Sequence, residues 1–456
     1  MKGSTLAILV LGLAVLFWQV ARARAYQFGG SGRFGSLPAQ HGWFAALWVL
    51  LPSLAFLAAW QINAPGMVTD AVLRDPAAAA LPPPGLTRAS LLAEARALAN
   101  GTATGAFHGL ARDLAHRYAT VQVRFNWIAT AATLGLALSA GFAALAKVHA
   151  GFRARSQVER LVTLLLLGAS LVAILTTAGI LASLLWESGR FFSLVSPGQF
   201  LLGTHWSPQS IDPAAPGDSL GSLPLFWGTF FIGAAIAMAV AVPLGLLSAI
   251  YLSQYATSTM RRVLKPALEV LAGVPTVVYG YFAALTVAPA VRHLGMALGN
   301  ADASGESALA AGLVMGIMIV PFISSVSDDS LAAVPSAMRE ASLALGATPA
   351  ETVRHVLLPA ALPGIAGGIM LAVSRAIGET MIVVMAASGV ATLTADPFAS
   401  TSTVTRQIVD LLTGEQTFDS PKTLAAFALG LALFGVTLCL NLAALGLVRR
   451  YRERYD

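Results

Sequence analysis

The chain has 456 residues, of which 56% are hydrophobic and 11% are charged, and its formal net charge is +6. This composition excludes an ordinary soluble domain and is typical of a polytopic membrane protein. One cysteine, Cys439, excludes a disulfide framework and a thiolate metal site, and the seven histidines show no metal-ligand spacing. We therefore expect an all-α membrane protein with neither a metal nor a cofactor.

Apolar runs long enough to cross about 30 Å of hydrocarbon as helices recur along the chain. They predict nine spans, at about residues 4–20, 43–60, 127–148, 160–186, 224–253, 268–290, 308–327, 364–390 and 424–448. The first run follows Lys2 and has two interpretations, a signal peptide or a retained span. No small-residue cleavage site follows it, and Arg22 and Arg24 flank it, which favours a retained span.

Basic residues are distributed unequally between the two sets of predicted loops. One set carries Arg22, Arg24, Arg33, Lys147, Arg153, Arg155, Arg160, Arg261, Arg262, Lys265, Arg339, Arg354, Arg449, Arg450, Arg452 and Arg454. The short loops opposite carry only Arg190, Arg292, Arg406 and Lys422. By the positive-inside rule the first set is cytoplasmic, so the basicity reflects topology and does not indicate nucleic-acid binding.

The order of the spans predicts two blocks. Residues 1–155 hold three spans and a long external segment, 61–126, in which residues 86–101 are a candidate amphipathic helix. Residues 156–456 hold six spans and an external linker, 187–223, whose Pro, Gly and Ser content predicts short pieces. We expect the second block to be the working unit and the first to be an N-terminal extension.

A polar, helix-prone segment at about residues 330–362 lies between two predicted spans. Pro335 suits the start of a helix and Gly346 suits a left-handed corner, while Thr348 and Glu351 form a capping signal for a second helix. Pro359 is expected to end that second helix. One apolar side of the first helix is predicted from Leu331, Val334, Met338, Ala341 and Leu345. Short helices are marginal alone, so the hairpin needs a docking surface, either other loops or a separate protein.

The same hairpin carries a recognisable pattern. Glu340-Ala341-Ser342, Gly346, Val356, Leu358 and Pro359 resemble the EAA signature of ABC importer permeases at every spacing, with departures at Ser342 and Val356. The resemblance implies that Glu340, Ala341, Gly346, Leu358 and Pro359 couple the chain to a separate cytoplasmic ATPase. None of the lysines follows a glycine, so the end of a P-loop is absent, and we expect a non-catalytic subunit.

Arg375 is the one basic residue left inside a predicted span, and Glu379 follows one helical turn later. A buried charge costs roughly 2.5 to 3.5 kcal/mol on insertion scales, so such residues face a cavity or a partner. The pair is either an internal ion pair that fixes packing or a translocation site. In the second case Arg375 offers a donor fork to an oxyanion and Glu379 limits its retention. Tyr279 either lines the same route or makes a helix contact.

Four stretches narrow the resemblance: "LAGVPTVVYGYFA" at 271–283, "GIMIVPFISSVSDD" at 316–329, "SRAIGETMIVV" at 374–384, and "WSP" with "LPLFWGT" between 206 and 229. They resemble the PstC-type permease of phosphate-specific ABC importers, over essentially the whole second block. This implies a six-span, type I, MetI-like permease core plus three extra N-terminal spans, in the bacterial inner membrane.

The implied partners are a homologous PstA-type permease in a heterodimer, a PstB-type ATPase dimer, a PstS-type periplasmic binding protein and inorganic phosphate. Three alternatives stay open. The chain is also compatible with the sister PstA-type permease, with a permease for sulfate or molybdate, and, from another class, with a membrane sensor or scaffold.

Overall fold

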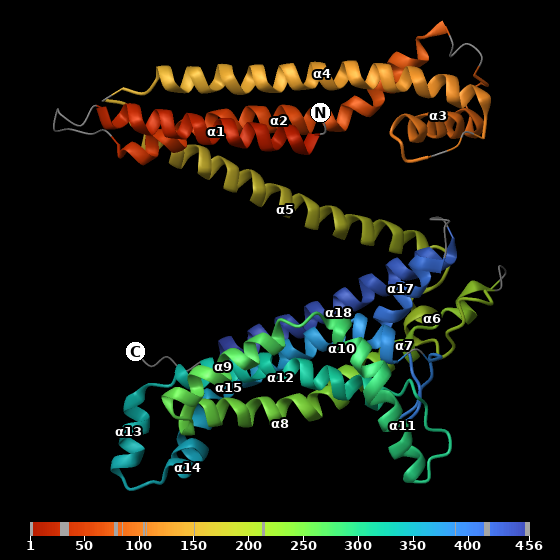
Figure 1. Cartoon of the computed structure of the whole chain (residues 1–456). Coiled ribbons are helices and arrows are strands. Elements are labelled where there is room, and N and C mark those ends of the chain that lie inside the picture. The colour runs from red at the N-terminus through yellow and green to blue at the C-terminus, as the bar shows by residue number, and fades with distance from the viewer. Residues whose placement is uncertain are drawn as a thin grey trace. The chain divides into compact units, whose positions relative to one another are not determined.

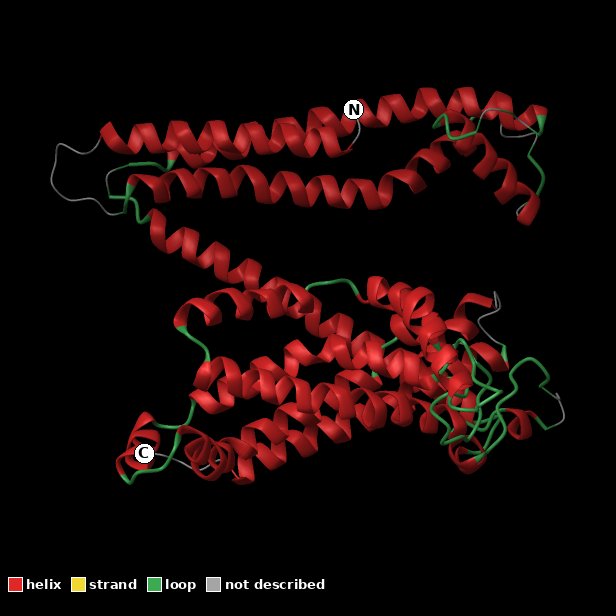
Figure 2. Ribbon diagram, turned by 60° about the horizontal axis from the view of Figure 1, so that its bottom comes forward, coloured by secondary structure: helices red, strands yellow, loops and turns green. Residues whose placement is uncertain are grey.

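The computed structural model describes residues 3–27, 36–76, 81–83, 85–103, 105, 107–149, 151–211, 215–387, 389–414 and 420–451. Arg33, Arg452 and Arg454, which were assigned to the cytoplasmic side, lie outside the described residues. Within the described residues the regular structure is helical apart from two isolated β-bridges, which confirms the predicted all-α class (Figure 2). Contacts divide the chain into two compact units, Met1–Leu175 and Thr176–Asp456, so the division falls inside α5 (Ala154–Phe192) and not near residue 155.

The first unit is built on three helices that lie side by side, α1 (Gly3–Tyr26), α2 (Pro38–Leu73) and α4 (Gly109–Ala146) (Figure 1). Their shared core buries small and aromatic side chains, including Phe17 and Phe44. α2 and α4 have 36 and 38 residues, more than a membrane requires, so both extend into the external segment predicted at 61–126. That segment contains α3 (Leu86–Ala99), which confirms the predicted amphipathic helix.

The second unit has a long central helix, α12 (Ala308–Ala332), with neighbours on several sides. Glycines permit the closest approach: an added Cβ at Gly312 or Gly316 would meet Ile236 or Val240 at less than 3 Å. The other helices of this unit are α6 (Pro197–Leu202), α7 (Leu223–Phe230), α8 (Ala237–Ile250), α9 (Ser258–Ala272), α10 (Thr276–Phe282), α11 (Ala288–Ala297), α13 (Ser336–Ala344), α14 (Pro349–Thr352), α15 (Leu358–Ile377), α16 (Met381–Ala386), α17 (Val404–Gly414) and α18 (Pro421–Tyr451).

Several of these helices join through π-helical segments into longer continuous helices. Across the described residues, eight helices are long and apolar enough to cross a membrane, and a bent pair raises the number to nine. In Figure 1, α13 and α14 lie at one end of α8 and α12, and α11 and α17 lie at the other. The predicted cytoplasmic and external loops of this unit therefore gather at opposite ends of its bundle.

The predicted span at 268–290 is wrong as a single straight helix. α9 ends at Ala272, the chain resumes as a helix at Thr276, and the two parts meet at 85°. Pro275 explains the break, because it has no amide hydrogen and disfavours a helical conformation at the residue before it. α9 is amphipathic, and none of its residues is buried within this chain.

The predicted span at 364–390 is also wrong in its bounds, and Pro359 does not end the second hairpin helix. Instead α14 passes through a π-helical segment, Val353–Leu357, into α15, and one helix runs from Pro349 to Ile377. Pro359 is tolerated inside this helix because it directly follows the wider π-helical turn. The hairpin and the span that carries Arg375 are therefore one continuous helix.

Candidate functional site

The hairpin corner has the geometry that its residue types predict. Gly346 has a φ of +89°, in the left-handed region, and no other described residue of the hairpin shares that conformation. Thr348 Oγ1 accepts a hydrogen bond from the Glu351 amide at 3.3 Å, and the Glu351 carboxylate accepts one from the Thr348 amide at 2.8 Å. The capping box is therefore complete, and the predicted corner is confirmed.

The base of the hairpin is packed, whereas its tip is open. Val334, Val353 and Leu357 form a buried cluster against Leu246 and Ile250 of α8. The tip does not follow the predicted apolar side, because Leu345 is 90% exposed. The hairpin is thus fixed at its base and presents an uncovered apolar side chain at its corner.

A hydrogen bond between the two arms involves one of the residues that departs from the EAA pattern. Ser342 Oγ and Thr352 Oγ1 lie 2.9 Å apart, and Thr352 is buried. An alanine at residue 342 has no hydroxyl group and makes no such bond. The substitution therefore preserves the hairpin and adds a contact between its arms.

Four charged side chains of the second unit line a cavity of about 240 Å³. Three elements contribute most of its wall: α9, α12 and the last turn of α15. The lining residues are Leu252, Lys265, Leu268, Glu269, Ala272, Met318, Pro321, Phe322, Ser324, Ser325, Asp328 and Arg375. The cavity therefore brings Arg375 together with side chains that are remote from it in sequence.

Arg375 lies over Phe322, with its guanidinium carbon 5.8 Å from the ring centroid. Among the described residues, no carboxylate lies within ion-pair distance of Arg375. The predicted Arg375–Glu379 pairing on one helix face is wrong, because α15 ends at Ile377 with Gly378 as its cap. The guanidinium consequently faces the cavity without an acidic partner.

Glu379 instead lies at the break between α15 and α16. Its carboxylate accepts a hydrogen bond from the Met381 amide at 3.1 Å, and its backbone carbonyl accepts one from the Thr405 hydroxyl at 2.9 Å. Both contacts stabilise the turn of the chain after α15. Glu379 thereby fixes the point at which the helix that carries Arg375 ends.

Sequence reasoning gave no role to Asp328, which is the most buried charged group at this cavity. Its side chain is 6% exposed, and it accepts hydrogen bonds from Arg261 at 3.1 Å and from Lys265 at 2.8 Å. Arg261 and Lys265 are one turn apart on α9, a spacing that was available in the sequence as a sign of one basic helix face. One carboxylate of α12 therefore holds two cations of α9.

Tyr279 does not line this cavity. Its ring is buried in the core formed with α8, α12 and α16, and its hydroxyl donates to the Leu271 carbonyl at 2.8 Å. Leu271 lies in the last turn of α9, on the other side of the bend at Pro275. Tyr279 therefore stabilises that bend, and the polar contacts of α9 include Tyr279 at one end and Asp328 nearer the other.

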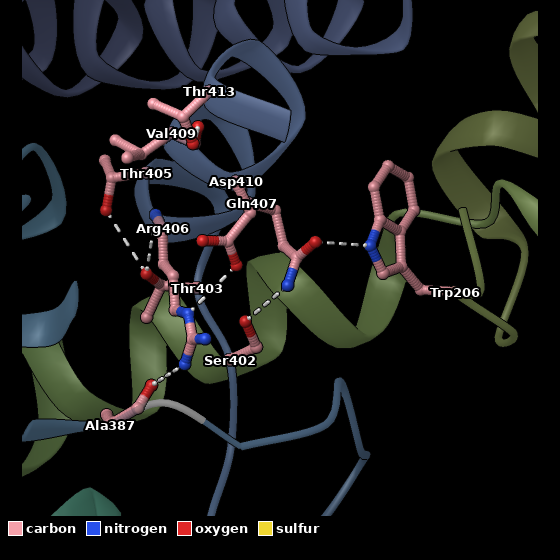
Figure 3. Close-up of polar contacts among 10 residues, drawn as sticks. All are labelled: Trp206, Ala387, Ser402, Thr403, Thr405, Arg406, Gln407, Val409, Asp410 and Thr413. Carbon is pink, nitrogen blue, oxygen red and sulfur yellow. Dashed lines mark hydrogen bonds and ion pairs between the residues drawn. The ribbon is translucent and has the colours of Figure 1, made fainter. Parts of the chain in front are cut away.

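At the opposite end of the bundle, α17 is fixed by a polar network (Figure 3). Arg406 donates to Asp410 at 3.1 Å and to the Ala387 carbonyl at 3.2 Å. Gln407 accepts from Trp206 Nε1 at 3.0 Å and donates to Ser402 at 3.1 Å. These contacts join three segments that are distant in sequence, so the end of the bundle opposite the hairpin is closely tied.

Two family models match the chain. The model described as a binding-protein-dependent transport system inner membrane component matches residues 241–453, and one described as a phosphate ATP-binding cassette transporter matches residues 5–176. The match at 5–176 corresponds closely to the first compact unit, and the match at 241–453 lies within the second. The core and the N-terminal extension are thus recognised separately.

Two curated relatives align with half to two thirds of the chain. A probable ABC transporter permease protein, YqgH of Bacillus subtilis, is 35% identical over 52% of this chain and 74% of its own length. The phosphate transport system permease protein PstC of Mesorhizobium japonicum is 32% identical over 65% of this chain and 89% of its own length. An inward-facing structure of the MetNI methionine ABC transporter aligns over 51% of this chain and 95% of that chain, with 19% identity and a TM-score of 0.37.

The family models and the curated relatives confirm what the helical bundle and its hairpin indicate, a multi-pass membrane permease that works with an ATPase and a substrate-binding protein. The chain belongs to the family of binding-protein-dependent ABC importer permeases, in the group of PstC-type subunits.

Proposed function

We propose that this chain forms half of the translocation route of an ATP-driven importer of inorganic phosphate in the bacterial inner membrane. Its proposed partners are a homologous PstA-type permease, a PstB-type ATPase dimer and a PstS-type periplasmic binding protein. The named function of the PstC relatives supports phosphate as the substrate. The observation that carries the proposal is the Arg375 guanidinium, which faces a cavity and has no acidic partner among the described residues.

Arg375 suits a tetrahedral oxyanion in both charge and shape. A guanidinium presents a planar fork of N–H donors that matches two oxygens of one anion. The hydroxyl groups of Ser324 and Ser325 line the same cavity and supply neutral donors for further oxygens. Phe322 stacks beside the guanidinium and limits its orientations.

Release of the anion requires weaker binding farther along the route. We assign this role to the cluster of Arg261, Lys265 and Asp328, in which two cations already share one carboxylate. An anion that leaves Arg375 meets cations that Asp328 neutralises in part, so it is attracted without being retained. The restraining carboxylate is then Asp328, while Glu379 positions Arg375 by ending its helix and Tyr279 positions α9.

The coupling hairpin supports an external energy source for this movement. Glu340, Ala341 and Leu345 are exposed around the Gly346 corner, which suits insertion into a groove of a separate protein. Leu358 and Pro359 lie where the hairpin arm becomes α15. Because one helix runs from Pro349 to Ile377, a displacement of the hairpin by the ATPase moves Arg375 as well.

Uptake of radiolabelled anions in cells that lack the gene tests the substrate. Restoring the chain should restore phosphate uptake, and an excess of sulfate or molybdate should leave that uptake unchanged. Sulfate or molybdate uptake that depends on the chain, with phosphate uptake intact in its absence, would reject phosphate as the substrate. If the sister permease alone restores phosphate uptake, the two-permease arrangement is wrong.

The sensor or scaffold alternative has a separate test. Detergent-extracted protein should copurify with a nucleotide-binding ATPase, and reconstituted complexes should hydrolyse ATP faster when the loaded binding protein is added. A chain that brings down a signalling protein and no ATPase would replace the importer by the scaffold.

A further inference from the structure

The first unit contains a second polar cavity, of about 270 Å³, that no part of the proposed route uses. It lies where the start of α1 meets α2, the end of α3 and the middle of α4. Its lining residues are Gly3, Leu6, Leu57, Trp60, Gln61, Ala64, Pro65, Val68, Arg96, Asn100, Tyr118, Gln122, Phe125, Asn126 and Ala129. All of them belong to the Met1–Leu175 unit, so this cavity is complete within that unit.

Arg96 is the one charged residue that lines this cavity. Its guanidinium donates to Thr69 Oγ1 at 2.7 Å and lies 5.9 Å from the centre of the Tyr118 ring. Tyr118 donates to the same threonine oxygen at 2.7 Å, so two side chains, Thr69 and Tyr118, fix the orientation of the cation. No carboxylate within the described part of the chain pairs with Arg96, and its charge is uncompensated.

The acidic residue nearest in sequence is already occupied. Glu94 lies two residues before Arg96 in α3, and its carboxylate accepts hydrogen bonds from the His108 ring at 3.0 Å and from the amides of Phe107 and His108. These three donors hold Glu94 at the connection to α4. Glu94 is not a lining residue and does not neutralise the cavity.

The remaining polar groups of the lining are carboxamides, the Tyr118 hydroxyl and the Trp60 indole N–H, and none is acidic. Gln61, Asn100, Gln122 and Asn126 each provide N–H donors without adding negative charge. An uncompensated guanidinium surrounded by neutral donors is suited to an oxyanion, and the absence of any acid from the lining means that nothing opposes its retention. Apolar residues, including Leu6, Leu57 and Ala129, form the rest of the wall.

We propose that this cavity is a binding site for a phosphoryl group, with Arg96 and the carboxamides around its oxygens. Two sources share this chemistry, inorganic phosphate and the headgroup of an anionic phospholipid. The aromatic pair Trp60 and Phe125, with ring centroids 6.1 Å apart, and the apolar wall favour the phospholipid, because they accommodate the hydrocarbon next to a headgroup. The site is separate from Arg375 and does not depend on the proposed transport route.

Trp60 lines the cavity and supplies a local reporter. The full-length protein is placed in nanodiscs that contain brominated phosphatidylglycerol or brominated phosphatidylcholine at equal mole fraction. The fluorescence difference between the wild type and Trp60→Phe isolates the signal of this residue. Quenching should be stronger with the anionic lipid, and Arg96→Ala should weaken that preference roughly tenfold, the effect of losing one charge-assisted hydrogen bond. Arg88→Ala, on the same helix but outside the lining, should keep the preference.

A parallel arm tests free phosphate. Inorganic phosphate is added to nanodiscs of phosphatidylcholine alone, and a saturable change of the Trp60 signal that Arg96→Ala removes identifies free phosphate as the ligand. Either result should persist in Arg375→Gln, which separates this site from the transport route. Native mass spectrometry of retained lipid gives the same comparison if Trp60→Phe does not fold. Equal behaviour of wild type and Arg96→Ala in both arms overturns the proposal.

Discussion

Two cavities of similar size differ in whether acidic side chains line them. The cavity of the second unit contains Arg375 and Lys265 together with Asp328 and Glu269. The cavity of the first unit contains Arg96 with carboxamides and no acid. A carboxylate competes with an anion for the same cations. The cavity of the second unit, which contains acids, therefore suits passage of an anion, and the cavity of the first unit, which contains none, suits its retention.

Replacing Arg375 tests this contrast with the largest expected effect. Arg375→Gln removes the donor fork, and charge-assisted hydrogen bonds contribute about 1.5–3 kcal/mol each, so phosphate uptake should fall at least ~10-fold. Radiolabelled uptake in the deletion strain measures the effect, and ATPase copurification shows that the complex still assembles. Arg262→Gln is the matched control, because Arg262 is on α9 but outside the cavity lining. Normal uptake in Arg375→Gln would reduce this residue to a packing role.

Removing the Asp328 carboxylate should make the cavity of the second unit more like the cavity of the first unit. In Asp328→Asn, Arg261 and Lys265 lose the negative charge that they share, so the anion should bind more tightly and leave more slowly. Because both cations are partly exposed, we expect a several-fold change, smaller than the full effect of breaking a buried pair. Equilibrium dialysis of phosphate against the purified complex should show a higher affinity, and radiolabelled uptake should show a lower rate.

Asp329→Asn provides the comparison for that experiment. Asp329 is adjacent and exposed, and it does not line the cavity. It should retain normal uptake and normal phosphate binding. If Asp328→Asn binds phosphate no more tightly than Asp329→Asn does, the proposed release step is wrong.

A change at the hairpin corner should affect phosphate passage through the cavity of the second unit and should not affect the cavity of the first unit. In Gly346→Val a β-branched residue must adopt φ +89°, which costs roughly 1–2 kcal/mol, while no atom lies within 4 Å of the added Cβ. The change therefore tests backbone conformation and not space. ATPase pulldown should weaken and phosphate uptake should fall, whereas the Trp60 signal should be unchanged. Ala344→Val, at an exposed position of α13, should leave the pulldown intact.

The smallest expected effect is a pH dependence of the connection between α3 and α4, next to the cavity of the first unit. Hydrogen bonds from the His108 ring, and then from the Phe107 and His108 amides, lower the pKa of Glu94 below its ordinary value. Their stabilisation is therefore present above the ordinary glutamate pKa and is lost as pH falls through the lowered value. Amide exchange at Phe107 and His108, corrected for intrinsic rates, should rise over that acidic window. Glu94→Gln should show the faster exchange at every pH.

Local signals in the sequence were sufficient to predict the hairpin and insufficient to predict the cavity around Arg375. Gly346, Thr348 and Glu351 act on backbone groups within a few residues, so their geometry is readable without a tertiary structure. The predicted helix end at Pro359 was wrong because the preceding π-helical segment accommodates the proline within a continuous helix. That segment has no sequence signal of its own.

The site around Arg375 depends on contacts between distant segments, which the hydrophobic periodicity of the sequence does not predict. The exit of the chain from α15 at Gly378 decides that Glu379 and Arg375 are not neighbours, and the bend at Pro275 decides that Lys265 faces Asp328. Both are outcomes of packing between distant segments. The class of each residue was predictable, but its partner was not.

The uncovered surfaces of α9 and of the hairpin corner also bear on how the protein is made. Val263 and Val270 of α9 and Leu345 of the corner are apolar and exposed in the single chain. A subunit synthesised in excess keeps these side chains uncovered, which marks it for chaperones and membrane proteases. We therefore expect this permease to accumulate only when its proposed partner subunits are synthesised in balance with it.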